Sequence, residues 1–199
     1  MIRPATARDR AAIARICLLT GAHGADATGV HGDDALLADV YALPYLDGPG
    51  GFGLVWDQGD GAVGYVLGTS DTASFQRWFS GEWWPRVAPT HTRVNETGAA
   101  LAEEAADPRR MLDADLGAYP AHLHVDLLPE AQGRGAGRAL IEAACALLAE
   151  RGVAGVHLGA SRANAGALAF YPRVGFAEVG GDEAGVTFAR RLGGAQVAE

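Results

Sequence analysis

Residues 123–152 decide the fold of this chain and read LHVDLLPEAQGRGAGRALIEAACALLAERG. The first part, residues 123–128, is short, mostly apolar and followed by Pro129, which is typical of a buried strand. Residues 132–138 form a glycine-rich turn that carries two arginines. From Ala139 onward apolar residues recur at helical spacing, and Gly152 suits the C-cap of that helix. The stretch therefore predicts a strand, a glycine turn and a helix.

The glycine turn has the features of a phosphate-binding site. The first turn of a helix leaves backbone N–H groups without acceptors, and the helix dipole adds partial positive charge there. Gly133, Gly135 and Gly137 remove side chains that would keep a ligand away from these amides. Arg134 and Arg138 add positive charge. The alternative interpretation of the same residues is a tight turn that only joins a strand to a helix.

The spacing of the glycines excludes two common phosphate-binding motifs. The dinucleotide fingerprint G-x-G-x-x-G fails, because Arg138 or Leu140 stands where its third glycine is required. The P-loop motif fails because this turn contains no lysine. The turn instead reads Gln-x-x-Gly-x-Gly, at Gln132, Gly135 and Gly137, after a strand that ends in Leu-Leu-Pro-Glu.

A second pattern follows in residues 161–176, which read SRANAGALAFYPRVGF. It contains Asn164, a short helical stretch, the pair Phe170-Tyr171 and then Gly175-Phe176. With the turn before it, this order resembles the acyl-CoA-binding region of the GNAT superfamily of N-acetyltransferases. The resemblance is strong over residues 123–188 and loose in the N-terminal half.

A further resemblance concerns residues 119–135, YPAHLHVDLLPEAQGRG. They are similar to bacterial relatives of the acetyltransferase-like domain attached to O-GlcNAc hydrolases. Some domains of that kind are thought not to catalyse a reaction. Two functions are therefore weighed: an active acetyltransferase, and an inactive acyl-CoA-binding or protein-interaction module on the same fold.

The GNAT resemblance implies acetyl-CoA as the acetyl donor and a primary amine, of a small molecule or a protein, as the acceptor. The backbone of Val125 and Leu127 is expected to pair with the pantetheine, with the Leu127 N–H polarising the thioester carbonyl. Asn164 is expected to contact the pantetheine arm, and the amides of residues 133–138 to hold the pyrophosphate. The full expected set of cofactor-binding residues is Val125, Leu127, Leu128, Gln132, Gly133, Arg134, Gly135, Ala136, Gly137, Arg138, Asn164 and Tyr171.

The resemblance also implies a general acid, Tyr171, which would protonate the leaving thiolate. A phenol with a pKa near 10 is protonated at neutral pH and can donate to a thiolate whose pKa is near 8.5. The alternative is an aromatic residue that packs on Phe170 and Phe176 at a helix end.

The general base is not identified by the resemblance. Relatives carry Glu or His in the fourth strand at positions that here are Ala121 and Leu123, neither of which accepts a proton. Strand alternation places His122, His124 and Asp126 on the opposite face, unless a bulge intervenes.

His124 and Asp126 are the two candidates for catalysis on that face, and a polar face with internal hydrogen bonds is the alternative interpretation. A chain of water molecules, His91 or Asp71 could also serve as the base.

Composition limits the class of protein. The chain has 199 residues, of which 49% are hydrophobic and 20% charged, so one domain over residues 1–192 is expected, with a flexible tail over residues 193–199. A net charge of −8 disfavours a nucleic-acid partner. Cys17 and Cys145 are expected to be buried hydrophobic residues. No signal peptide or membrane-length apolar run is visible, so a cytoplasmic monomer or homodimer is expected.

The rest of the chain predicts an α+β fold with a mixed, mainly antiparallel sheet of about seven strands and helices on both faces. The expected helices and strands outside residues 123–152 are a strand over 1–5, helices over 9–19 and 33–45, a hairpin of strands 52–56 and 62–68, a helix over 97–107, a strand over 153–159, a helix over 164–170 and strands over 176–179 and 186–190.

Two segments are candidates for the acceptor side. Residues 71–84 are rich in aromatic side chains and are expected to line an acceptor cleft together with the loop around Asp26. Core packing is the alternative for the aromatic residues. The loop also carries His23 and His31, but a solvated loop is favoured over a metal site there, and no metal is predicted.

Overall fold

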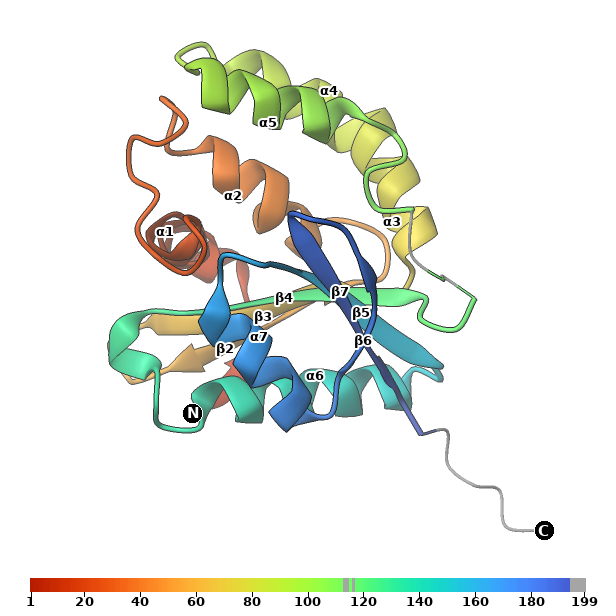
Figure 1. Ribbon diagram of the computed structural model, residues 1–199. Coiled ribbons are helices and arrows are strands. Elements are labelled where there is room, and N and C mark those ends of the chain that lie inside the picture. The colour runs from red at the N-terminus through yellow and green to blue at the C-terminus, as the bar shows by residue number, and fades with distance from the viewer. Residues whose placement is uncertain (113–114, 116, 194–199) are drawn as a thin grey trace, which may run out of the picture.

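The computed structural model describes residues 1–112, 115 and 117–193 (Figure 1). Its strands are β1 (Ile2–Pro4), β2 (Gly51–Asp57), β3 (Ala62–Thr69), β4 (Ala121–Leu127), β5 (Gly155–Ser161), β6 (Ala177–Gly181) and β7 (Gly185–Arg191). Its α-helices are α1 (Arg10–Thr20), α2 (Leu36–Tyr41), α3 (Thr72–Trp78), α4 (Trp84–Val87), α5 (Glu96–Ala106), α6 (Ala136–Glu150) and α7 (Ala165–Phe170). Of the tail expected over residues 193–199, residues 194–199 lie outside the described part.

The strands form one seven-stranded sheet in the order β1-β2-β3-β4-β5-β7-β6. Only the β4–β5 contact is parallel among the pairings of the described strands; the others are antiparallel. This confirms the mixed, mainly antiparallel sheet expected from the sequence. Since β4 and β5 run in parallel, the connection between them must cross over, and α6 provides that crossover.

Helices cover both faces of the sheet, as predicted (Figure 1). The stripe Leu140, Ile141, Ala144 and Leu148 of α6 is fully buried against one face. Helices α1 and α2 cover the other face, and the segment from α3 to α5 packs outside α2. Apolar residues at helical spacing on α6 explain its position, because burying that stripe removes it from water.

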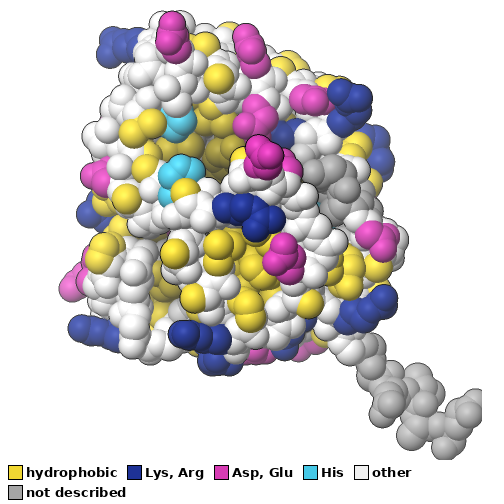
Figure 2. Space-filling model, in the orientation of Figure 1, with side chains coloured by type: hydrophobic (Ala, Val, Ile, Leu, Met, Phe, Trp, Pro, Cys, Tyr) yellow, Lys and Arg dark blue, Asp and Glu magenta, His cyan; other side chains and the backbone are white. Residues whose placement is uncertain are grey.

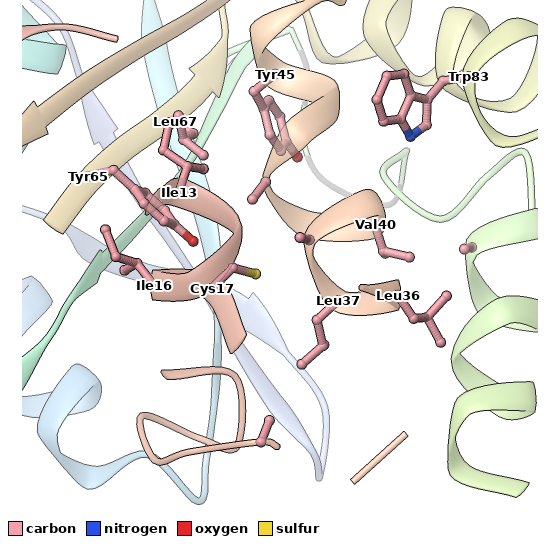
Figure 3. Close-up of a cluster of buried hydrophobic side chains, with 14 of the residues drawn as sticks. Ile13, Ile16, Cys17, Leu36, Leu37, Val40, Tyr45, Tyr65, Leu67 and Trp83 are labelled. Atoms are coloured by element: carbon pink, nitrogen blue, oxygen red, sulfur yellow. The ribbon is translucent and has the colours of Figure 1, made fainter. Parts of the chain in front are cut away.

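The core under α1 and α2 is built from helix and strand residues that point at one another (Figure 3). Ile13, Ile16 and Cys17 of α1 pack there with Tyr65 and Leu67 of β3, and all five side chains are buried. Cys17 and Cys145 are both buried and free, which confirms their predicted role as small hydrophobic residues.

The helix expected over residues 33–45 is shorter than predicted. Helix α2 ends at Tyr41, and a 3₁₀ turn, Leu43–Leu46, follows it. Pro44 explains the break, because its ring cannot donate the hydrogen bond that a continuing helix needs. The turn brings Tyr45, which is 1% exposed, back over the sheet.

The aromatic side chains of residues 71–84 pack in the core, which is the alternative interpretation of this segment. Phe75 stacks on Tyr45 with ring centroids 4.5 Å apart, and Phe79 stacks on Trp84 at 6.1 Å. The indole Nε1 of Trp83 donates to the carbonyl oxygen of Asp39 at 2.8 Å. These side chains belong to the core that joins the α3–α4 segment to α2. Phe75 also meets the His122 ring edge-on at 5.6 Å, so the start of this segment borders the polar face of β4.

Among the described residues, no helix combines the length and the apolar character needed to cross a membrane.

Candidate active site

Strands β4 and β5 diverge in the middle of the sheet. They pair only at Ala121↔Val156 and His122↔His157. Beyond that point residues 123–127 of β4 do not pair with residues 158–161 of β5. The two strand edges therefore leave backbone groups free to pair with an extended ligand in the gap.

The hydrogen bonds of β4 show which of its amides face this gap. The Leu128 N–H donates to the Val63 carbonyl at 2.9 Å, on the β3 side. Because consecutive N–H groups of a strand alternate, the amides of Leu127 and Val125 point to the gap. Gln132 Nε2 donates to the Leu127 carbonyl at 2.8 Å from the gap side. The amides of Val125 and Leu127 thus face the gap, whereas the Leu128 amide donates to β3 and its side chain is buried.

The glycine turn leads from the end of β4 into α6 beside the gap. Gly135 is the N-cap residue of α6 and has φ = 80°, a conformation that glycine adopts without strain. The Ala139 N–H donates to the Gly135 carbonyl at 3.0 Å, so the amides of residues 135–138 have no helical acceptor before them. This is an amide-lined helix N-terminus at the place where the sequence predicts a pyrophosphate site.

Close packing fixes the position of this N-terminus. A Cβ atom on Gly137 would lie 3.1 Å from the Leu127 side chain and 3.3 Å from the Phe170 ring. The absence of a side chain at Gly137 therefore lets α6 approach the end of β4 and the helix α7 together. Arg138 Nη2 donates to the Arg173 carbonyl at 2.8 Å, while Arg134 is exposed at the turn.

Asn164 lies on the β5 side of the gap as the N-cap of α7. Its Oδ1 accepts from the Ala167 N–H at 2.9 Å. A Cβ atom on Gly24 would lie 3.3 Å from Asn164 Nδ2, so the glycine-rich loop of residues 21–32 reaches this side chain. Asp26 of that loop accepts from the Thr28 N–H and hydroxyl, and among the described residues no cluster of His, Cys, Asp or Glu could hold a metal.

Tyr171 follows α7 in the 3₁₀ turn Tyr171–Val174 and is 7% exposed. Its ring contacts Phe176 and Phe188 at centroid distances of 5.9 and 5.4 Å. No hydrogen bond to its hydroxyl comes from the residues that the structure describes. Burial, and then the negative charge of Asp126, raises the pKa of Tyr171. The phenol is therefore protonated at neutral pH. It also lies close enough to β4 for the charge of the Asp126 carboxylate to raise its pKa.

The opposite face of β4 carries a hydrogen-bonded histidine pair. The hydroxyl of Tyr45 lies 2.7 Å from His122 Nε2 and 3.0 Å from His124 Nε2. His122 Nδ1 lies 2.8 Å from Thr72 Oγ1. His122 is buried and His124 half-buried. The β3–β4 pairing keeps one register from Leu127 to His122, so no bulge turns these side chains to the other face.

Asp126 lies on the same face, further along β4. Its Oδ2 accepts from the Tyr65 hydroxyl at 2.6 Å. Burial raises the pKa of Asp126, and its hydrogen bond with the Tyr65 hydroxyl opposes that rise. The carboxylate is thus held by the Tyr65 hydroxyl of β3.

Burial is the largest cause of the lowered pKa of both histidines. It lowers the pKa of His124 to about 4 and that of His122 well below its usual value. The positive charge of Arg110, which packs over the rings of Tyr41 and Phe79 at 5.5 and 4.9 Å, acts in the same direction. Both imidazoles are therefore neutral at pH 7, as a proton acceptor must be.

The two remaining candidates for the base have structural roles. His91 lies between carboxylates, with Nδ1 2.9 Å from Asp33 and Nε2 3.2 Å from Asp39, and its side chain is 4% exposed. Asp71 caps α3 by accepting from the Ser74 N–H at 2.9 Å. These contacts give both groups a role in holding local structure.

A hollow of about 780 Å³ is lined mainly by residues of β5, β6 and β7. His157 lines it, and the rings of His157 and His122 lie 5.7 Å apart. Its rim includes the carboxylates of Asp115 and Asp182. Figure 2 shows one face of the molecule, on which histidine side chains lie beside a recess lined by hydrophobic side chains.

Comparison with known proteins agrees with this geometry. Residues 25–176 match the family model described as the acetyltransferase (GNAT) family. The chain belongs to the GNAT family. The solved structure named SsHAT is 40% identical, with a TM-score of 0.88, and the match covers 97% of this chain and 98% of that one.

More distant GNAT structures share the fold. The ribosomal-protein-S18-alanine N-acetyltransferase from Escherichia coli has a TM-score of 0.53 at 17% identity, over 100% of this chain and 99% of its own. A GCN5-related N-acetyltransferase from Kribbella flavida has a TM-score of 0.57 at 16% identity, over 96% and 97%.

Sequence reasoning missed the side chains that hold the candidate base. Tyr45, Thr72 and Tyr65 all bond to the polar face of β4, yet none stands out in the sequence. Tyr45 lies 77 residues before His122. Alternation along β4 could place His122 and His124 on one face, but no local pattern identifies their partners.

The neutral histidines make stability depend on pH. A His whose pKa is about 4 in the folded state and about 6.5 when unfolded contributes stability above pH 6.5 that is lost as the pH falls. For His124 the loss between pH 7 and pH 5 should be about 2 kcal/mol. Asp126, with a raised pKa, acts in the opposite direction. Urea unfolding at the two pH values measures the change.

The matched control is His124→Asn, which removes one titrating group from the same site. Its free energy of unfolding should fall less between pH 7 and pH 5 than that of the unaltered protein. An equal fall in both proteins would contradict the assignment of a neutral, buried His124.

Proposed function

We propose that this protein transfers an acetyl group from acetyl-CoA to a primary amine of a small molecule or a protein. The observation that carries the proposal is the gap between β4 and β5. It opens onto the amides of the α6 N-terminus, with Tyr171 near one side of β4 and His124 and Asp126 on the other. A cytoplasmic location, expected from the sequence, belongs to this proposal.

The chemical groups around the gap match those of acetyl-CoA. An extended pantetheine carries amide groups, which suit the backbone groups of Val125 and Leu127. A pyrophosphate suits the amides of residues 135–138 and the nearby Arg134. The Leu127 N–H would then polarise the thioester carbonyl, and Asn164 would bind the pantetheine arm from the β5 side.

The protein's own groups would move the protons of the reaction. The acceptor ammonium loses one proton to a base on the polar face of β4, and its nitrogen then attacks the thioester carbon. The C–S bond breaks, and Tyr171 gives its proton to the thiolate. The second nitrogen proton, released as the amide forms, restores Tyr171. The products are the N-acetylated amine and CoA, with one proton passed from the base to solvent.

The hollow beside His157 is the proposed entrance of the acceptor. His157 lines it and meets the His122 ring at 5.7 Å, and His122 meets the His124 ring at 6.0 Å, so a row of imidazoles joins the hollow to the candidate base. The carboxylates of Asp115 and Asp182 at its rim favour a positively charged acceptor.

A thiol-release assay tests the proposal. Acetyl-CoA is offered with a panel of amines that includes amino acids, diamines, amino sugars and lysine peptides. At least one amine should give release of CoA thiol well above the rate without acceptor, with the acetylated amine confirmed by mass. Tight CoA binding without transfer to any amine would instead favour the inactive acyl-CoA-binding module.

A further inference from the structure

We propose that Tyr45 and His122 are positioning residues that hold neutral His124 with its lone pair on Nδ1, so that Nδ1 is the atom that accepts the proton of the acceptor ammonium. This inference rests on the proposed function and deepens it. It follows from the direction of a chain of hydrogen bonds that starts at Thr72 and ends at His124.

The two hydrogen bonds of the Thr72 hydroxyl fix the donor-to-acceptor direction of the whole chain. Thr72 Oγ1 lies 2.8 Å from the Pro120 carbonyl oxygen and 2.8 Å from His122 Nδ1. A carbonyl oxygen can only accept, so the hydroxyl proton of Thr72 must point to Pro120. Without that proton two oxygen atoms would face each other at hydrogen-bond distance. Thr72 Oγ1 therefore accepts from His122, and the proton of His122 is on Nδ1.

The Tyr45 hydroxyl, which bonds to both histidines, then determines which nitrogen of His124 carries the proton. Neutral His122 with its proton on Nδ1 has a lone pair on Nε2, and the Tyr45 hydroxyl, 2.7 Å away, donates to it. The Tyr45 oxygen can then only accept from His124 Nε2 at 3.0 Å. His124 must carry its proton on Nε2, which leaves the lone pair on Nδ1.

The neighbours of His124 favour the neutral state on which this argument depends. Tyr41 of α2 meets its ring edge-on at 6.0 Å, and Arg110, after α5, brings positive charge. His122 on β4 and His157 on β5 are the other titratable groups nearby, with Tyr45 between the helices and the sheet. Burial lowers the pKa of both histidines in the chain.

The alternative base on this face, Asp126, is differently placed. Its Oδ2 accepts from the Tyr65 hydroxyl at 2.6 Å, and no hydrogen-bond chain from other elements among the described residues fixes a proton on it. His124 instead ends the chain from Thr72, which fixes its proton on Nε2 and its lone pair on Nδ1.

NMR of the whole protein labelled with ¹⁵N in its six histidines tests the proton positions directly. Two-bond ¹H–¹⁵N spectra at pH 7 distinguish the two neutral forms, and His122→Asn and His124→Asn variants assign the signals. We expect the Nδ1–H form for His122 and the Nε2–H form for His124. The reverse pattern, or a charged ring at either position, overturns the proposal.

The kinetic test is Tyr45→Phe, which keeps the ring that stacks on Phe75. It leaves the Nε2–H of His124 without its acceptor, so both neutral forms of His124 should appear in the spectrum. With the best amine of the panel, kcat should fall about tenfold or more, and KM for acetyl-CoA should stay within about twofold.

Tyr41→Phe is the matched control, because it removes a hydroxyl beside the same histidine without touching the chain of hydrogen bonds. Its kcat and its His124 signal should stay close to those of the unaltered protein. If Tyr45→Phe keeps both kcat and a single Nε2–H form, Tyr45 is not a positioning residue.

The two proposals can fail separately. The expected proton positions without transfer to any amine would reject the proposed function and leave the hydrogen-bond chain intact. Acetyl transfer with the reverse proton positions would support the function and reject Nδ1 of His124 as the base.

Discussion

Tyr171→Phe is expected to lower kcat by about a hundredfold or more while CoA affinity and folding change little. The substitution removes the only proton that Tyr171 can give to the leaving thiolate. Its ring contacts with Phe176 and Phe188 do not involve the hydroxyl, so the core around them should remain. Steady-state kinetics with the best amine, CoA titration and thermal unfolding measure the three quantities.

The structure gives two reasons for a large effect. The raised pKa of Tyr171, caused by burial and by the Asp126 charge, keeps the phenol protonated at neutral pH. Among the described residues nothing accepts its proton, so the group is available to a ligand. A structural tyrosine in this position would be expected to bond to a neighbouring carbonyl.

A packing control separates chemistry from stability. Phe176→Leu shrinks a neighbour of Tyr171 that is 3% exposed, and it should lower the midpoint of thermal unfolding while kcat stays within a few-fold. Near-full turnover in Tyr171→Phe, with its true acceptor, would show that Tyr171 is only a packing residue and that another group protonates the thiolate.

The strand, turn and helix of the proposed cofactor side could be predicted from the sequence because their signals are local. The strand, the turn and the helix occupy one continuous stretch, and Gly135 and Gly137 have the conformation and the close packing that glycine alone allows. The gap between β4 and β5 follows from the family resemblance, and the short β4–β5 pairing agrees with it.

The acceptor side could not be predicted, because its contacts join distant parts of the chain. Tyr45 reaches β4 only because Pro44 ends the helical region and turns the chain back over the sheet. Thr72 reaches His122 across 50 residues. The two interpretations of the aromatic residues in 71–84 could not be separated from the sequence, because apolar composition is the same for a cleft wall and for a layer of core side chains.

Gly135→Val is expected to weaken CoA binding by about 10- to 100-fold. The turn offers its amides to a pyrophosphate, and each hydrogen bond to a charged group contributes about 1.5–3 kcal/mol. Gly135 has no atom within 4 Å of a Cβ position, so a valine side chain fits without a clash inside the protein, and we expect it to obstruct a pyrophosphate on the neighbouring amides. Calorimetric titration with CoA, on protein shown to be folded by circular dichroism, measures the loss.

The backbone strain of this change needs its own control, since φ = 80° is unfavourable for valine. Gly152, just after the C-terminal end of α6, is the matched control position. It has φ = 74° and, like Gly135, has no atom within 4 Å of a Cβ position. Gly152→Val should cost a similar amount of stability, about 1–3 kcal/mol, and leave CoA affinity unchanged. If both variants bind CoA as the unaltered protein does, the pyrophosphate does not lie on this turn. If both lose affinity equally, strain alone explains the loss, and only a selective loss in Gly135→Val places the phosphate on the amides of α6.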